Sequence, residues 1–132
     1  MAKSKTIGKL KKEAWRLLSL VKRSIDWAYP DGTNICYTCG VRKPWKEMQA
    51  GHLLDGRSNS ILFEEIGINP QCAGCNIFKS GNKEVYIPKF IDEYGRDLYE
   101  ELIWKKHQIR KISRSEYEEM IAEYKRRLNE MA

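Results

Sequence analysis

Two cysteine pairs, Cys36-Tyr37-Thr38-Cys39 and Cys72-Ala73-Gly74-Cys75, lie on either side of Gly51-His52 and contain every cysteine of the chain. Four cysteines in two Cys-x-x-Cys pairs are typical of a closed tetrahedral zinc site, which stabilises a fold and leaves the metal no open position. Gly40 follows the first pair, where the backbone must turn tightly around such a metal. We therefore expect structural zinc to organise this region.

The distance between the two pairs bears on this interpretation. The 32 residues of the insert, 40–71, exceed the spacing of a compact zinc ribbon, so the insert must form structure of its own. The Cys-x-x-Cys motif also occurs in thiol–disulfide exchange proteins. No βαβ pattern surrounds either pair, which favours structural zinc over redox chemistry.

Composition indicates one domain, residues 1–132, because 42% apolar and 32% charged residues are typical of a soluble globular protein. No apolar run approaches the length of a membrane span, and no leader of the secretory kind is recognisable. We therefore expect a cytoplasmic protein with no membrane partner. In that compartment, paired cysteines bind metal more often than they form disulfides.

The net charge of +6 is concentrated near the N-terminus. Residues 1–24 hold eight Lys and Arg against Glu13 alone, whereas the remainder has 16 basic and 17 acidic residues. Apolar side chains at helical spacing between Ile7 and Ala28 predict a helix within residues 1–30 that also carries a basic face. Such a face suits a polyanionic partner, nucleic acid first, although a solvated tail would have the same charge. Candidate phosphate contacts on it are Lys9, Lys12 and Arg16.

Between and after the cysteine pairs, the sequence predicts short strands followed by helices. Residues 48–54 suit a strand, residues 61–63 its return strand, and residues 76–82 a short helix that Gly81 stops. Helical spacing recurs over 85–94 and 98–107, with Gly95 between.

A last helix is predicted from Ser115, because Ser115 and Glu118 match a capping box. Its apolar stripe could pack against a second copy of the chain, in a homodimer, or fold back on its own core. The stripe consists of Tyr117, Met120, Ile121, Tyr124, Leu128 and Met131.

Taken in order, the first cysteine pair, Gly51-His52, Gln71 to Asn76 and Ser80-Gly81-Asn82 resemble the HNH (ββα-metal) endonuclease superfamily. The segment is most similar to the phage NinG/Rap recombination endonuclease group and, more distantly, to the zinc-containing phage endonuclease VII. The resemblance implies an α+β fold with a zinc-stapled ββα-metal core over residues 34–85. The basic N-terminal helix and the C-terminal helices of residues 86–132 would flank this core.

The resemblance also implies roles for individual residues. His52 would be the general base that activates a water, since a neutral imidazole accepts a proton near neutral pH. Asn76 would help to hold one divalent cation, Mg²⁺ or Mn²⁺, which prefer oxygen ligands. Arg57, Lys79 and Lys83 would contact phosphates. The alternatives are a structural His52 and an Asn76 that only caps a helix.

Two positions depart from the superfamily pattern. Many HNH enzymes carry Asp or His as a metal ligand directly before the base, where this chain has Gly51. Asp55 is our candidate for the absent carboxylate, although its place before Gly56 also suits a turn residue; the other candidates are Glu64 and Glu65. The superfamily's middle Asn braces the loop that carries the base. Asn69 is the candidate for this role, only three residues before Cys72.

These observations lead to a functional hypothesis and to one alternative. The hypothesis is a metal-dependent endonuclease that hydrolyses DNA, at branched recombination or replication intermediates, in the cytoplasm of a bacterial host. The preference for branched DNA rests on the resemblance alone. The alternative is a non-catalytic zinc module that binds nucleic acid through residues 1–24.

Overall fold

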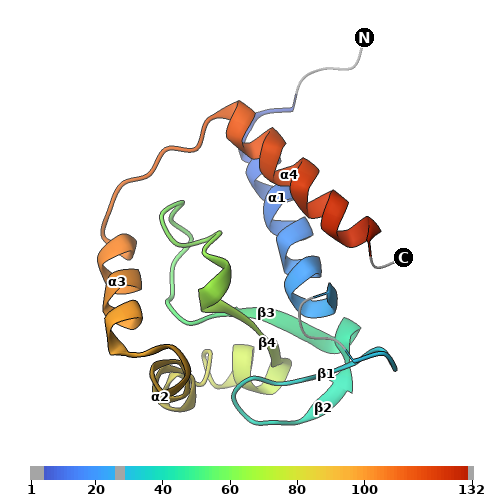
Figure 1. Cartoon of the computed structure of the whole chain (residues 1–132), viewed down its shortest axis with the longest axis vertical. Coiled ribbons are helices and arrows are strands. Elements are labelled where there is room, and N and C mark those ends of the chain that lie inside the picture. The colour runs from blue at the N-terminus through green and yellow to red at the C-terminus, as the bar shows by residue number, and fades with distance from the viewer. Residues whose placement is uncertain (1–4, 26–28, 131–132) are drawn as a thin grey trace.

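A computed structural model describes residues 5–25 and 29–130 of the chain. Two helices, α1 (Ile7–Leu20) and α4 (Arg114–Asn129), pack side by side along one side of a small β-hairpin. Two further helices, α2 (Lys83–Tyr94) and α3 (Arg96–Lys106), lie on its other side (Figure 1). The fold is therefore α+β, as expected.

Helix α1 and helix α4 form the larger core of the molecule. Helix α1 begins after Thr6, whose hydroxyl accepts a hydrogen bond from the backbone N–H of Lys9, and continues as a π-helical segment, Val21–Ile25. Its apolar stripe packs on the predicted stripe of α4, so that stripe is covered by its own chain. The buried residues of this core include Leu10, Ala14, Leu17, Leu18, Tyr117, Ile121 and Tyr124. The predicted stripe positions Ala28 and Met131 lie outside the described residues.

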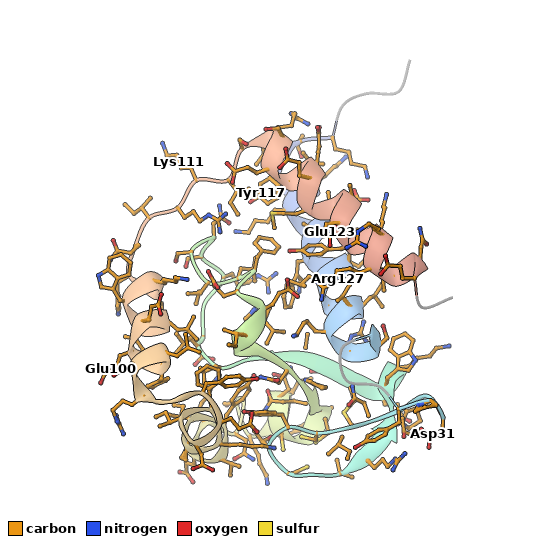
Figure 2. All side chains as sticks on the ribbon, in the orientation of Figure 1. Asp31, Glu100, Lys111, Tyr117, Glu123 and Arg127 are labelled. Carbon is orange, nitrogen blue, oxygen red and sulfur yellow. The ribbon has the colours of Figure 1, made fainter. Side chains whose placement is uncertain are left out.

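The start of α4 differs from the prediction by two residues. Ser113, not Ser115, is the N-cap, and it exchanges hydrogen bonds with Glu116 in a capping box. Both serines have Glu three residues later, but Ser113 is the one at which the extended backbone ends. Figure 2 shows Tyr117 on the inner side of α4, whereas Lys111, in the segment before this helix, points away from the molecule.

Two antiparallel hairpins carry the cysteines and His52. The first pairs β1 (Thr33–Ile35) with β2 (Arg42–Pro44), and the second pairs β3 (Met48–His52) with β4 (Ile68–Cys72). The register of the second hairpin sets Gly51 opposite Asn69 and His52 opposite Ile68.

The predicted return strand at residues 61–63 is therefore wrong. These residues form a turn in which Ile61 and Leu62 are buried, so their apolar character reflects burial and not strand pairing. The true return strand contains Pro70, a residue that usually argues against a strand. It is accommodated opposite Ala50, and its carbonyl accepts a hydrogen bond from Tyr37 N (2.8 Å).

The segment that contains Cys75 and the residues after it is a π-helical turn, Gly74–Phe78, in place of the helix predicted over 76–82. Helices α2 and α3 agree with the predicted spacing, and Gly95, at a φ of 93°, separates them. They bury Tyr86, Phe90 and Leu102 against Leu53, which follows β3. Within the described ranges, no helix has the length and apolar character needed to cross a membrane.

Candidate metal centre and the cleft beside it

The four cysteine sulfurs lie within 4.8 Å of one another, and those of Cys39 and Cys72 are 3.7 Å apart. A disulfide would bring two sulfurs to about 2.05 Å. A tetrahedron with zinc–sulfur bonds of about 2.3 Å has edges of about 3.8 Å. The cluster therefore has the dimensions of a site that could bind a zinc ion, as the spacing predicts.

Three separate elements supply these sulfurs. Cys36 follows β1, and the turn to Cys39 closes when Gly40, at a φ of 79°, donates its N–H to the Cys36 carbonyl (3.0 Å). Cys72 ends β4, and Cys75 lies in the π-helical turn. A bound metal would thus hold the first hairpin, the second hairpin and the π-helical turn together.

The environment of Cys36 favours the thiolate that a metal requires. Its burial would raise the pKa of the thiol, but hydrogen bonds from the Thr38 hydroxyl and from backbone N–H groups lower that pKa to about 6. A thiolate is the form of cysteine that binds metal. At Cys39, by contrast, burial raises the pKa of the thiol to about 12, so of these two cysteines only Cys36 has surroundings that favour the thiolate before a metal binds. The four sulfurs fit a structural zinc ion by their number, their chemistry and their spacing.

The Ser80-Gly81-Asn82 segment connects the metal centre to α2. All three residues have positive φ angles, of 49°, 91° and 50°. This left-handed path lets Asn82 donate its side-chain amide to the Cys75 sulfur (3.6 Å) while Gly81 N donates to the Cys75 carbonyl (2.9 Å). The motif therefore has a structural role next to the cysteines.

Gln71 explains why glycine precedes His52. The Gln71 side chain is fully buried and donates its amide to the Gly81 carbonyl (2.8 Å) and to the Thr38 hydroxyl (3.1 Å). Its oxygen lies over Gly51, where an added Cβ would come within 1.8 Å of it. Within the described part of the chain, this oxygen is a buried polar atom without a hydrogen-bond partner. Gly51 thus leaves room for the Gln71 amide.

Beside the metal centre, a cleft of about 340 Å³ brings together five of the residues predicted for the site. They are His52, Asp55, Arg57, Asn76 and Lys83. The other residues that line it are Trp15, Ala50, Leu54, Gly56, Ser80 and Gly81. The predicted residues Asn69, Lys9, Lys12, Arg16 and Lys79 are not part of its lining.

His52, at the end of β3, is held by one hydrogen bond and one ring contact. Its Nε2 is 3.0 Å from the Leu62 carbonyl, and because a carbonyl can only accept, Nε2 carries the proton and Nδ1 keeps its lone pair. The ring stacks on Trp15, with centroids 4.8 Å apart and an interplanar angle of 28°. Burial, helped by the charges of Lys83 and Arg57, lowers the pKa of His52, so the imidazole is neutral at pH 7.

Lys83 holds the chain that follows His52. Its ammonium donates to the carbonyls of His52 and Leu53, the latter at 2.8 Å, and lies 3.4 Å from the Asp55 carboxylate. Burial lowers the pKa of Lys83. The Asp55 side chain is 81% exposed at the mouth of the cleft, in reach of solvent and ligands. Lys83 therefore has a structural task in addition to any contact with a ligand.

The two predicted asparagines occupy different places. Asn69 is buried away from the cleft and donates to the Tyr86 hydroxyl (3.0 Å), which in turn donates to the Gly51 carbonyl (2.8 Å). It is therefore linked to β3 beside His52 through Tyr86. Asn76 donates its amide to the Gln49 side-chain oxygen (2.6 Å) and lines the cleft.

The alternative carboxylates lie in ion pairs. Glu64 lies 3.3 Å from Lys105 of α3, and Glu65 lies 2.8 Å from Arg127 of α4, which is labelled in Figure 2. Neither lines the cleft with Asp55. Asp55 is therefore the carboxylate that shares the cleft with His52.

The predicted phosphate contacts outside the cleft are all exposed. Lys9, Lys12 and Arg16 lie at helical spacing on α1, and Lys79 follows the π-helical turn. Sequence reasoning missed Trp15, Gln71 and Tyr86 as neighbours of the site. Gln71 had one usable signal, its place in the motif before Cys72, whereas nothing local to Trp15 or Tyr86 marks their partners.

Comparison with protein families gives one match, to the family described as Bacteriophage Lambda NinG protein, over residues 2–132. Neither the curated proteins nor the solved structures contain a match to the chain. The family match covers nearly the whole sequence and includes both cysteine pairs. The chain, with its four-cysteine cluster that could bind zinc, therefore belongs to the family of the bacteriophage lambda NinG protein.

Proposed function

We propose that this NinG-family protein is a metal-dependent, HNH-type endonuclease that hydrolyses DNA phosphodiester bonds. The observation that carries the proposal is a neutral His52, whose Nδ1 keeps its lone pair, in a cleft that also contains Asp55 and Asn76. The ordered motifs that resemble the HNH superfamily support it. Branched recombination or replication intermediates in the host cytoplasm are the proposed substrates, by resemblance to phage recombination endonucleases.

The residues of the chain account for the proton transfer. Nδ1 of His52 takes a proton from a water as the oxygen of that water forms its bond to phosphorus. The bond from phosphorus to the bridging sugar oxygen breaks, and this oxygen leaves and takes a proton from solvent. The Nε2–H group donates to the Leu62 carbonyl and stabilises the imidazolium that forms. Stacking on Trp15 fixes the plane of the ring. Both contacts reduce the reorganisation that the reaction requires.

The cleft residues fit a hard divalent cation. Asp55 offers a carboxylate and Asn76 an amide oxygen, and Mg²⁺ sites commonly use one or two carboxylates together with substrate phosphates. When bound, Mg²⁺ or Mn²⁺ would offset the charge that builds on the phosphate. In the ranges that the structure describes, the cysteines form the one cluster of three or more His, Cys, Asp or Glu ligands. The cleft therefore offers the proposed Mg²⁺ or Mn²⁺ fewer than three ligands of these residue types. We expect the phosphate of the DNA to supply further ligands to that ion.

Basic side chains extend the proposed DNA-binding surface beyond the cleft. Arg57 lines the cleft, and Lys79 directly precedes Ser80, which also lines it. The exposed face of α1 carries Lys12 and Arg16. Contacts of this kind with phosphates position DNA without reading its sequence. Binding is therefore expected to weaken steeply with salt.

The test is cleavage of a labelled branched DNA and a matched linear duplex, with Mg²⁺ or Mn²⁺ and with EDTA. Wild type, His52→Ala and His107→Ala are compared, since His107 is the other histidine and is exposed outside the cleft. Loss of a general base is expected to reduce cleavage by about 10²–10⁴-fold, while binding persists and His107→Ala cuts normally. The zinc content of each protein is measured to exclude unfolding.

Two results would overturn the proposal. One is absence of cutting by folded, zinc-loaded wild type, and the other is wild-type cutting by His52→Ala. The first leaves a non-catalytic zinc module that binds nucleic acid as the better account.

A further inference from the structure

The tip of the π-helical turn exposes two large apolar side chains. Phe78 is 83% exposed and its neighbour Ile77 is 56% exposed. Exposed aromatic surface forgoes the stabilisation that burial would give, so a cluster of this kind marks a surface for interaction.

The backbone under Phe78 is held in place from both sides. Lys79 N donates to the Gly74 carbonyl (3.0 Å), and Ser80 N donates to the Ile77 carbonyl (3.1 Å). Cys75, three residues before Phe78, is buried in the metal centre. The aromatic ring therefore projects from a constrained turn and not from a long loop.

The surroundings of Phe78 indicate what it meets. Asn76, Ser80 and Gly81, on either side of it in the chain, line the cleft that contains His52. No acidic residue occurs over residues 66–83, whereas Lys79 and Lys83 do. An exposed apolar side chain two residues from the lining of a cleft that also contains Arg57 and Lys83 matches DNA, in which stacked bases lie between charged phosphates.

We propose that Phe78 is a wedge that stacks against a base opened at the branch point of a bound DNA. This proposal rests on the proposed function, because it assumes that DNA lies in the cleft. Apolar side chains that enter a base step must separate stacked bases, which costs free energy. At a branch point the stacking is already interrupted, so the wedge meets less resistance there than in a continuous duplex. Phe78 would thereby give the protein a structural preference for branched DNA.

The test uses a branched DNA with 2-aminopurine at the branch point, whose fluorescence rises when it loses stacking with neighbouring bases. Binding is measured without added Mg²⁺ or Mn²⁺, so that no strand is cut. Wild type is expected to raise the fluorescence and Phe78→Ala to leave it near that of free DNA. Phe78→Ala is also expected to bind the branched DNA about 10-fold more weakly, from the usual contribution of base–aromatic stacking. Its affinity for linear duplex should change much less.

The matched control is Ile109→Ala. Ile109 is 94% exposed, like Phe78 a solvent-facing apolar side chain, but it lies between α3 and α4 and outside the cleft lining. Ile109→Ala should behave as wild type in both measurements. Because Phe78 is exposed, its replacement should not affect folding, and equal zinc content confirms this for each variant.

The outcomes separate this inference from the proposed function. Unchanged fluorescence and affinity in Phe78→Ala overturn the wedge, even if the protein cuts DNA. A change in self-association of Phe78→Ala, with DNA binding unaltered, also overturns it and assigns the surface to a second copy of the chain. A third outcome is that wild type raises the fluorescence, Phe78→Ala does not, and wild type never cuts DNA. This outcome supports the wedge and refutes the endonuclease proposal.

Discussion

Gly51→Ala is expected to destabilise the protein because the new Cβ would overlap with the side chain of Gln71. The new Cβ would lie 1.8 Å from the Gln71 side-chain oxygen and 2.6 Å from the carbon that bears it. Gln71 is fully buried, so its amide cannot swing into solvent to relieve the overlap. It must shift inside the core, away from the Gly81 carbonyl and the Thr38 hydroxyl that it now contacts.

The size of the effect follows from these contacts. An overpacked core site costs about 1–3 kcal/mol. A buried carbonyl that loses its donor adds about 1–3 kcal/mol. Alanine stiffens the unfolded chain and returns about 0.4–1 kcal/mol. We therefore expect Gly51→Ala to lower the free energy of unfolding by about 1–6 kcal/mol, which is substantial beside the ~5–15 kcal/mol typical of a domain.

Urea unfolding followed by circular dichroism, at one fixed zinc concentration, measures this loss. The matched control is Gly8→Ala in α1, where the nearest side-chain atom would be 4.0 Å from the new Cβ. It should be neutral or stabilising, by up to about 1 kcal/mol, because alanine favours helix. In the double variant Gly51→Ala/Gln71→Ala the collision is gone, so the two changes should couple by about 1–3 kcal/mol. Wild-type stability of Gly51→Ala, or strictly additive effects, would refute the reasoning.

Three further expectations concern the site. Burial lowers the pKa of His52, and Trp15→Ala should expose this side chain, so the pKa should rise. The pH below which cutting is lost should therefore move to a higher value. An unchanged pH–rate profile would contradict this. Tyr86→Phe should cost about 1–3 kcal/mol in urea unfolding, because the buried Asn69 amide loses its acceptor, and an unaltered midpoint contradicts it. Removal of zinc by a chelator should lower the melting temperature sharply, with recovery when zinc is returned; a melting curve unchanged after verified metal loss would show that the cluster is not structural.

The parts of the fold that sequence could predict are those with a local signal. Spacing alone predicted the cysteine cluster, and helical periodicity predicted α2 and α3 with Gly95 between them. The return strand β4 had no such signal. It contains Asn69, Pro70 and Gln71, all buried, and polar side chains become acceptable inside only when distant partners satisfy them. Those partners are Tyr86, Thr38 and Gly81.

The candidate site divides in the same way. The resemblance predicted that His52 and Asn76 belong to one site, and both residues line the same cleft. The reason for Gly51 was missed, because the collision it avoids comes from a side chain twenty residues away in the chain. The stacking of Trp15 on His52 depends on how α1 crosses the hairpin, and no local pattern specifies such a crossing.

The pairing of α1 with α4 has a consequence for the order in which the molecule folds. Residues 21–113 separate the two helices, and closing so long a loop is entropically slow. The cysteine cluster lies within that loop and joins residues 36–75, so a bound zinc ion would shorten the effective loop before the helices meet. Refolding should therefore be faster with zinc than without it. Because α1 supplies Trp15, which stacks on His52, we expect the cleft to be completed only when α1 packs against the rest of the molecule.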